Sequence, residues 1–307
     1  MKFCVIGSGS IGKRHIRNIA AVCEMKNIPY CLDLFRSTKS QLSDDILPLI
    51  ERQIYDFDEL DNSYDAIVIA NPTHLHYPTI KKFYDKSDCF FVEKPVFDDL
   101  NIPIDELLTN KNKKFYVACP LRYLNVVQQA KIIIKKEKIN SVRAICSSYL
   151  PDWRVGQDYR KLYCAHKEQG GGVKIDLIHE WDYLITLFGY PSDVKTFAGK
   201  FSSLEIDSDD LAIYISKYDD FLLELHLDYF GKTSQRYFEL FCDSGTYKFD
   251  LIENSISFNG NIVKQFVELP NDKYIKEISS FIDISIKNLQ SINTLEHACD
   301  IMKISLS

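Results

Sequence analysis

The apolar positions of the 307-residue chain follow two different rhythms, and the change falls near residue 120. In the first part, short runs of β-branched and aromatic residues alternate with stretches of helical periodicity. The runs predict strands at 2–6, 30–35, 66–70, 89–92 and 114–118, and the stretches between them predict helices at 11–24, 75–86 and 98–110. Wholly apolar strands that alternate with helices are typical of a parallel sheet covered on both faces. We therefore expect a doubly wound α/β domain over residues 1–119.

After residue 120 the strands become two-faced, because apolar and polar positions alternate along them. A helix is expected at 123–136, a strand at 141–150, and a helix at 176–188 that follows a glycine-rich hinge at 170–172. Turn sequences such as 243–246 and 257–260 then separate short strands in hairpin fashion. These features predict an α+β domain over residues 120–307 with a large, mostly antiparallel sheet that leaves one face open. The remaining predicted elements are strands at 194–201, 210–216, 221–230, 236–242, 245–251 and 255–260, and helices at 274–288 and 294–305.

Composition excludes several classes of protein. With 46% hydrophobic and 26% charged residues, the chain has the composition of a soluble globular protein. The formal net charge of −6, without a dense run of Lys and Arg, argues against a nucleic-acid partner. No apolar run has the roughly twenty residues that a membrane-spanning helix needs. The nine cysteines are scattered without a C-x-x-C pair, so we expect no metal centre and a cytoplasmic location.

A glycine motif follows the first predicted strand directly. In a G-x-G-x-x-G that ends a strand and opens a helix, the first glycine permits a tight turn, the second admits a pyrophosphate, and the third lets helix and strand pack closely. The amide groups and the positive dipole end of the helix then bind the phosphates. A glycine-rich turn without a ligand is the alternative. The motif predicts that the first domain is a dinucleotide-binding Rossmann domain, with Gly7, Ser8, Gly9, Ser10, Ile11 and Gly12 at the cofactor.

The end of the second strand bears on the choice of cofactor. Asp33 follows Gly12 by about twenty residues, as the ribose-binding carboxylate of an NAD site does, but the apolar run continues beyond it, so Asp33 is expected in mid-strand. The strand then ends in a guanidinium, two hydroxyls and an ammonium, which suit a phosphate dianion. We therefore favour NADP, with NAD held by Asp33 as the alternative. The expected phosphate-binding residues are Arg36, Ser37, Thr38 and Lys39.

Two further segments follow predicted strands of the first domain, at the sheet edge where ligands bind in open α/β folds. The segment Glu93-Lys94-Pro95 follows the fourth strand, and Pro95 biases Lys94 towards an extended conformation that points its ammonium group into the crevice. A surface lysine is the alternative. The segment after the third strand contributes Asn71, Pro72, Thr73, His74 and His76 to the expected cofactor site, and Glu93 and Lys94 join them.

Candidate substrate residues lie in the second part. Asp176 and His179 are three residues apart, so on one helix they would face one substrate, although a helix-start carboxylate beside an ordinary histidine explains them too. In the segment 151–160, Trp153 can stack on a sugar ring, while Arg154 and Arg160 can bind a carboxylate or phosphate. A packed surface loop is the alternative for this segment.

Taken in order, the glycine motif, N-P-T-H-x-H at 71–76, E-K-P at 93–95 and G-G-G…D-x-x-H at 170–179 resemble the Gfo/Idh/MocA oxidoreductase family over nearly the whole chain. The resemblance implies that Lys94 contacts the reacting hydroxyl, that His179 is the acid/base histidine and that Asp176 is the carboxylate before it. Arg122 matches an arginine that contacts cofactor and substrate. Two positions depart from the family: members more often have D-x-x-x-H, and many have an asparagine where this chain has Leu121 before Arg122.

The resemblance implies an NAD(P)-dependent oxidoreductase that transfers hydride between the nicotinamide and a secondary alcohol or ketone of a sugar. The loop arginines favour an acidic or nucleotide-activated sugar, and D-W-R…D-Y-R at 152–160 resembles relatives in surface-glycan synthesis. Two other functions stay open: an NAD-dependent glycosidase of the same family with no net redox change, and a non-catalytic dinucleotide sensor. The open face of the sheet predicts a homo-oligomer, a dimer or tetramer.

Overall fold

The computed structural model describes residues 1–307 and divides into two compact units. The first unit consists of Met1–Pro120 and Asn271–Asp300, and the second of Leu121–Pro270 and Ile301–Ser307. The boundary between Pro120 and Leu121 thus lies one residue after the boundary expected from the sequence, which follows residue 119. Asn271–Asp300, which the sequence pattern assigns to the second domain, instead belongs to the first unit.

The first unit contains the expected parallel sheet. Its strand order is β3-β2-β1-β4-β5-β6, and every neighbouring pair is parallel. The order reverses direction between β1 and β4, and ligands of doubly wound folds bind at that switch point, at the carboxyl ends of the strands. The strands are β1 (Lys2–Ile6), β2 (Cys31–Phe35), β3 (Arg52–Ile54), β4 (Ala66–Ile69), β5 (Cys89–Val92) and β6 (Lys114–Val117).

Two elements of this unit differ from the prediction. Strand β3 is absent from the prediction because it has only three residues, too few to show a period. The helix predicted at 98–110 is wrong: only the 3₁₀ turn Ile104–Glu106 forms there. Pro103 explains the difference, because proline disfavours the helical conformation in the residue before it and lacks the amide that a helix interior needs.

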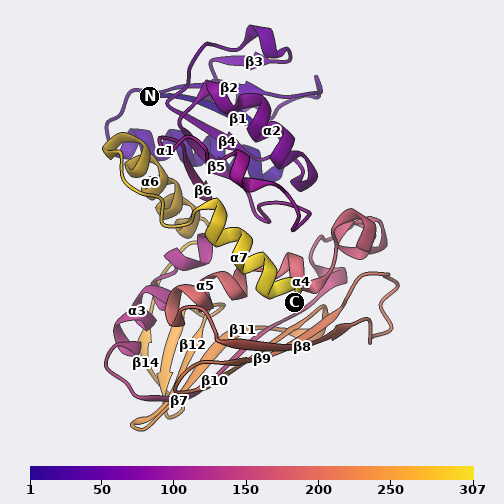
Figure 1. Ribbon diagram of the computed structural model, residues 1–307, viewed down its shortest axis with the longest axis vertical. Coiled ribbons are helices and arrows are strands. Elements are labelled where there is room, and N and C mark those ends of the chain that lie inside the picture. Colours follow the sequence, from indigo (N-terminus) through magenta and orange to yellow (C-terminus); the bar gives the residue numbers. More distant parts are fainter. The chain divides into compact units, whose positions relative to one another are not determined.

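Three helices cover the sheet: α1 (Ser10–Met25), α2 (His76–Phe83) and α6 (Asp272–Lys287). Figure 1 shows α6 alongside α1, although about 250 residues separate them in the sequence. Phe281 of α6 is fully buried and lies edge-on to Phe91 of β5, with ring centroids 5.3 Å apart. Lys26 donates to Asp283 at 2.8 Å. The return segment therefore completes the core of the first unit.

The second unit is built on an eight-stranded sheet of order β14-β13-β12-β11-β7-β10-β9-β8. All its neighbouring pairs are antiparallel except β10 with β7. Figure 1 shows α3, α4 and α5 on one side of this sheet and no helix on the other, which confirms the predicted open face. The elements are α3 (Asn125–Ile134), β7 (Ile139–Tyr149), α4 (Val173–Asp176), α5 (His179–Phe188), β8 (Asp193–Gly199), β9 (Leu211–Lys217), β10 (Leu222–Asp228), β11 (Phe230–Cys242), β12 (Gly245–Asp250), β13 (Ser255–Phe258), β14 (Asn261–Gln265) and, at the second division between the units, α7 (Leu295–Leu306).

The helix predicted at 176–188 is interrupted. Asp176 ends the short helix α4, and His179 begins α5. Leu177 lies between them with φ −96° and ψ 21°, outside the helical region. Contrary to the prediction, the two residues therefore do not share the face of one continuous helix.

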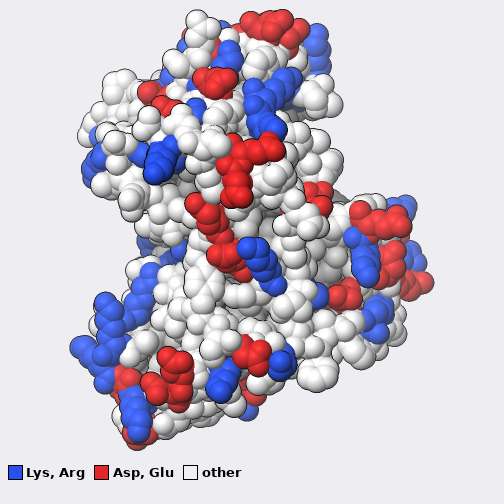
Figure 2. All heavy atoms as spheres, in the orientation of Figure 1, with Lys and Arg blue, Asp and Glu red and all other residues white.

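Acidic and basic side chains are intermixed over the face shown in Figure 2, without a large area of one sign. None of the helices combines the length and the apolar character needed to span a bilayer.

Candidate functional site

The glycine motif forms a tight turn that packs directly against the end of β4. Gly7 has φ +100°, and a Cβ atom there would lie 2.7 Å from the carbonyl oxygen of Ala70. A Cβ atom at Gly12 would lie 2.2 Å from the carbonyl oxygen of Gly7. A Cβ atom at Gly9, by contrast, would have no neighbouring atom within 4 Å. Gly7 and Gly12 thus serve the packing of the turn, whereas Gly9 faces open space.

The open space lies at the start of α1. This helix begins at Ser10 without a side-chain cap, so its first amide groups have no partner within the helix and are oriented to bind an anion. Gly9 and Ser10 are exposed and Ser8 and Ile11 are half-buried, which leaves the turn accessible. The residues present therefore fit the pyrophosphate of a dinucleotide.

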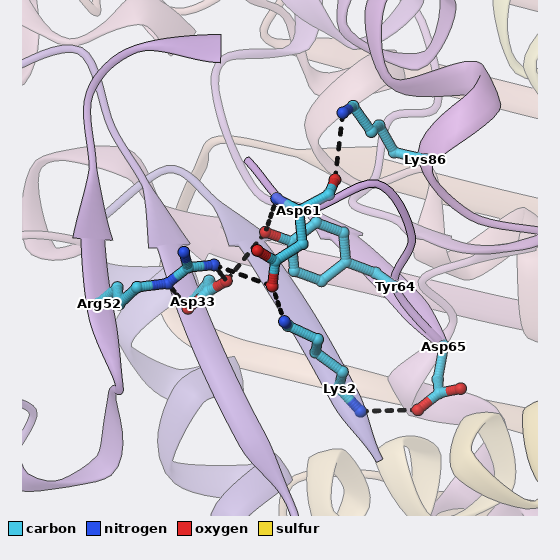
Figure 3. A network of polar contacts seen from close by, with 7 residues as sticks. All are labelled: Lys2, Asp33, Arg52, Asp61, Tyr64, Asp65 and Lys86. Carbon is cyan, nitrogen blue, oxygen red and sulfur yellow. Dashed lines mark hydrogen bonds and ion pairs between the residues drawn. The ribbon is translucent and has the colours of Figure 1, made fainter. Parts of the chain in front are cut away.

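Asp33 is fully buried in the middle of β2, where the apolar run predicts it. Its carboxylate accepts hydrogen bonds from both Nε and Nη2 of Arg52, with Nε at 3.0 Å, and from the hydroxyl of Tyr64 at 2.8 Å. Arg52 also pairs with Asp61, which in turn pairs with Lys2 (Figure 3). Asp33 therefore belongs to a structural network and offers no exposed carboxylate to a ribose.

The residues after β2 form the loop expected to bind a 2′-phosphate. Arg36 is buried, and its Nη2 donates to the carbonyl and hydroxyl of Ser40 at 2.5 and 2.6 Å, while Nη1 donates to Gln53 at 3.3 Å. The guanidinium group is thus occupied by Ser40 and Gln53, and its bidentate contact with a phosphate stays a prediction. The exposed donors that remain at this strand end are Ser37, Thr38 and Lys39.

His76 contacts the backbone of two segments, and its contact with a cofactor stays a prediction. It is buried at the start of α2, with Nε2 3.0 Å from the carbonyl oxygen of Asn71 and Nδ1 3.0 Å from that of Val96. Both ring nitrogens therefore face backbone carbonyl oxygens, and the neutral ring can donate to one of the two. Asn71 donates its side-chain amide to Thr79 at 2.8 Å. The members of this segment that remain exposed or half-exposed are Pro72, Thr73 and His74.

The E-K-P segment leaves β5 at the same edge of the sheet. The Glu93 carboxylate is buried, and its Oε1 lies 2.5 Å from Nε2 of His15 on α1, while Oε2 accepts the backbone amide of Lys94 at 3.1 Å. Glu93 therefore stabilises the turn, and its contact with a cofactor stays a prediction. Lys94 is half-exposed, and the peptide bond between Lys94 and Pro95 is cis.

In the second unit, Asp176 is the centre of a buried hydrogen-bond cluster. Its Oδ1 accepts the hydroxyl of Tyr163 at 2.6 Å, and its Oδ2 accepts that of Tyr229 at 2.5 Å. Burial and the neighbouring carboxylate both raise the pKa of Tyr163, so this hydroxyl keeps its proton and remains a donor. A Cβ atom at Gly171 would lie 2.4 Å from the carbonyl oxygen of Tyr163, so the triple glycine admits another stretch of backbone here.

His179 and Arg122 lie in different surroundings. His179 is the first residue of α5 and is half-buried. Arg122 is buried and forms a two-pronged ion pair with Asp182, through Nε at 2.8 Å and Nη2 at 2.7 Å. This pair fastens the start of the second unit to α5. Arg122 therefore has a structural role, and its contact with cofactor and substrate stays a prediction.

The two arginines of the loop 151–160 differ in whether their charge is paired. Arg160 pairs with Asp158 through two nitrogens, at 2.8 and 3.0 Å, and with Glu205 at 3.0 Å, so its charge is neutralised within the unit. Arg154 is exposed and forms no ion pair, and its positive charge acts on Tyr163 by opposing the rise of that pKa. Of the two, only Arg154 presents an uncompensated cation.

Trp153 lies beside the Asp176 cluster. Its indole N–H donates to Ser148 at 2.9 Å, and its ring is edge-on to Tyr229 with centroids 5.1 Å apart. The exposed fractions of Trp153 and Tyr163 are 38% and 45%, so two aromatic surfaces remain open near one carboxylate. Such surfaces suit the apolar faces of sugars.

Three residues of these sites are absent from the sequence-based predictions: His15, Tyr163 and Tyr229. His15 lies three residues after Gly12, and that position on the first helix is the one available signal. Nothing in the sequence pairs Tyr229 with Asp176, because 53 residues separate them.

Parts of the chain are similar in sequence to known proteins. Residues 1–117 match the GFO_IDH_MocA family model, described as an oxidoreductase family with an NAD-binding Rossmann fold. The 2,7-anhydro-N-acetylneuraminate hydratase of Escherichia coli is 27% identical over 137 residues, which cover 44% of this chain and 36% of that protein. The uncharacterized oxidoreductase YrbE of Bacillus subtilis is 36% identical over 94 residues, 30% of this chain and 27% of that protein. The matched segments thus span about a third of each curated relative.

Solved structures match over the whole chain. Levoglucosan dehydrogenase in complex with NADH has a TM-score of 0.85 at 16% identity, covering 99% of this chain and 95% of that one. UDP-N-acetylglucosamine 3-dehydrogenase from Acidithiobacillus ferrooxidans has a TM-score of 0.78 at 17% identity, with 100% and 95% covered. Myo-inositol 2-dehydrogenase from Lactobacillus plantarum has a TM-score of 0.76 at 18% identity, with the same coverage. The likeness extends the shared fold beyond the Rossmann domain to the whole chain, while the match to the oxidoreductase family model covers residues 1–117.

Proposed function

We propose that this chain is an NAD(P)-dependent oxidoreductase that transfers hydride between the nicotinamide and a secondary alcohol or ketone of a sugar. The observation that carries the proposal is the turn Gly7–Gly12, where two glycines are required by packing and the third leaves space at an uncapped helix start. The match of residues 1–117 to an oxidoreductase family supports the redox chemistry. Dehydrogenases of sugars and of a cyclitol are among the proteins of the same fold, which supports the substrate class.

A nicotinamide dinucleotide, when bound, would supply the hydride acceptor, and the residues of this chain would handle the proton. We propose that Lys94 polarises the reacting oxygen and stabilises negative charge that develops on it. His179 would exchange the proton of that oxygen. Asp176 is held by two tyrosine hydroxyls, and its proposed role is to orient the substrate rather than to carry a proton. The proposal requires Lys94 and His179 to reach the same oxygen atom.

We propose NADP as the preferred cofactor. Two features support it: the only carboxylate of β2 is buried in its own network, and the strand ends in exposed hydroxyls and an ammonium group. Because Arg36 is occupied by Ser40 and Gln53, the proposed phosphate ligands are Ser37, Thr38 and Lys39. Lys39→Ala is expected to weaken NADPH binding about tenfold and to leave NADH binding unchanged, as measured by nucleotide fluorescence. Equal losses for the two nucleotides would contradict the assignment.

We propose an acidic or nucleotide-activated sugar as the substrate, within surface-glycan synthesis. Arg154 supports this, because it is an exposed cation without an acceptor beside two open aromatic surfaces. Two of the similar proteins act, by their names, on an N-acetylneuraminate and on a UDP-linked sugar.

A reaction without net redox change is the second candidate. The relative from Escherichia coli is named as a hydratase, and an NAD-dependent glycosidase shares that absence of net oxidation. The two candidates differ in whether reduced nucleotide accumulates during turnover.

One experiment tests both candidates. The purified chain is incubated with NAD or NADP and a panel of sugar acids, nucleotide sugars and neutral sugars, while reduced nucleotide is followed by absorbance and products by mass spectrometry. The proposed function predicts reduced nucleotide in proportion to oxidised sugar, and its loss by orders of magnitude in Lys94→Ala. Product without reduced nucleotide would establish the second candidate. Dinucleotide binding without any product would favour the sensor.

We also propose that the chain forms a homo-oligomer through the open face of the eight-stranded sheet, which exposes Phe197, Ile215 and Leu222. A cytoplasmic location remains a prediction of the sequence.

A further inference from the structure

Two buried histidines hold the segment that carries Lys94, one on each side of it. On the N-terminal side, His15 of α1 contacts Glu93, whose second oxygen accepts the Lys94 amide. On the C-terminal side, His76 of α2 lies 3.0 Å from the carbonyl oxygen of Val96. The exposed fractions of His15 and His76 are 0% and 1%. Neither histidine is therefore placed to meet a ligand, and both contact the backbone or side chain next to the lysine.

In the contact between His15 and Glu93, the histidine is the hydrogen-bond donor and the carboxylate is the acceptor. Burial favours the protonated form of Glu93, but the hydrogen bond from His15 and the charges of His15 and Lys94 outweigh it, so the pKa of Glu93 lies below its ordinary value. The ionised carboxylate is an acceptor, and Nε2 of His15 must donate to it. Nδ1 of His15 is buried without a hydrogen-bond partner, so Glu93 is the one hydrogen-bond partner of the ring.

Filling the hydrophobic core does not by itself explain why a histidine is buried at position 15. A leucine would fill a similar volume without burying a ring nitrogen that has no partner, a situation that costs free energy. The contact to Glu93 offsets that cost only because the carboxylate needs a donor. His15 also belongs to the helix whose first turn forms the phosphate cradle. The hydrogen bonds therefore connect the cradle to the lysine in two steps, from His15 to Glu93 and from Glu93 to the Lys94 amide.

We propose that His15 and His76 are positioning residues that fix Lys94 relative to the nucleotide cradle. The proposal rests on the proposed function for the catalytic meaning of Lys94. Between the two anchors, Pro95 restricts its own φ angle, so little freedom remains in the backbone that carries the ammonium group. Small displacements of a reacting group can reduce turnover about 100-fold, so the two hydrogen bonds matter for rate more than for cofactor affinity.

The first test compares His15→Leu with His15→Gln, because the glutamine amide can replace the Nε2 donor and leucine cannot. The expected result for His15→Leu is a kcat about 10- to 100-fold lower, with NAD(P)H affinity within about twofold of the parent. His15→Gln should recover most of the loss. His226→Leu, a single histidine loss on the open sheet face, is the matched control and should keep the parent kcat. Equal kcat values in His15→Leu and the parent would overturn the proposal.

A second measurement distinguishes an effect of His15 on the position of Lys94 from a general loss of activity. In the Lys94→Ala background, adding His15→Leu should lower kcat no further, because the group being positioned is absent. A full additional loss there would mean that His15 acts through something other than Lys94. His76→Leu should follow the same two patterns, and it provides the test if His15→Leu does not fold.

A third measurement does not depend on catalysis. Hydrogen–deuterium exchange at the Lys94 amide should be slow in the parent and at least tenfold faster in His15→Leu, because Glu93 loses the donor that holds its carboxylate against that amide. Unchanged exchange would overturn the proposal even if the chain is a dehydrogenase. Faster exchange in a chain that oxidises no sugar would support the positioning while the proposed function fails.

Discussion

At the residue scale, the glycine turn separates packing from ligand binding. Gly12 is required by the fold, since a Cβ atom would lie within 2.2 Å of a carbonyl oxygen, whereas Gly9 has no neighbour within 4 Å and an ordinary φ of −66°. Gly9→Ala is therefore expected to keep the parent thermal stability and to weaken NAD(P)H binding at least tenfold, since the methyl group occupies the path of the pyrophosphate. Gly12→Ala should lose stability as well.

The measurements are thermal unfolding without nucleotide and fluorescence titration with it. Unchanged affinity in Gly9→Ala would place the pyrophosphate elsewhere.

The buried ring of His76 predicts a pH dependence of stability. Burial lowers its pKa from the ordinary value of 6.5, so the unfolded chain binds more protons at this position below that pH. Its contribution to stability is complete above about pH 6.5 and is lost as pH falls through the lower folded pKa. The melting temperature of the parent should therefore fall more steeply between pH 7.5 and 5.5 than that of His76→Leu. Parallel curves would contradict this expectation.

Residue roles were predictable where they follow from neighbours in sequence. The place of Asp33 in mid-strand followed from the apolar residues after it, and the glycine roles from the strand before them. The partners of Arg122, His76 and Asp176 did not follow, because each lies on an element whose position only the folded chain determines. An arginine before a helix has the same appearance in the sequence whether it binds a phosphate or an aspartate.

At the scale of elements, the ion pair of Arg122 and Asp182 joins the 3₁₀ turn Pro120–Tyr123 to α5. Their side chains are only 6% and 8% exposed, so removing one charge leaves the other without a counterion in a poorly solvated place. Asp182→Asn is expected to lower the free energy of unfolding by about 3–5 kcal/mol in urea titrations. The control is Asp243→Asn, which breaks an exposed pair with Lys138 and should cost less than about 1 kcal/mol. Similar costs for both variants would contradict a structural role for Arg122.

Elements were predicted well when they were long and regular. The ten-residue α3 and the seven-residue β9 show clear periods, whereas β3 and β14 lie at sheet edges and have three and five residues. Only one residue of β3 and none of β14 is buried, so these two strands lack the apolar signal that the edge strand β6 carries. The break between Asp176 and His179 could not be foreseen, because the residues around it are individually compatible with a helix.

At the scale of the whole molecule, the first unit depends on a segment from the other end of the chain. Phe281→Ala in α6 should lower the free energy of unfolding of this unit by about 3–5 kcal/mol, since it removes a fully buried ring that packs on Phe91. Ile286 lies on the same helix with 49% of its side chain exposed, and Ile286→Ala should have little effect. Denaturant titrations in which NAD(P)H binding reports the unfolding of the first unit check both variants. Equal effects would mean that α6 does not belong to this core.

The open sheet predicts self-association. Phe197 of β8 is 72% exposed, and Ile215 of β9, two residues along from its cross-strand partner Ile213, is 39% exposed. If this face joins copies of the chain, Phe197→Glu should shift the mass measured by light scattering to that of a monomer while each subunit stays folded. A monomeric parent would end the proposal.

The split composition of the first unit has a consequence for synthesis. A ribosome releases Met1–Pro120 well before Asn271–Asp300, and all of Leu121–Pro270 emerges in between. The nucleotide-binding sheet must therefore wait, with Phe91 and the neighbouring face uncovered, until the last part of the chain arrives. The first unit is therefore expected to remain incomplete through most of translation, and nascent chains stalled before residue 271 should recruit chaperones more than finished ones.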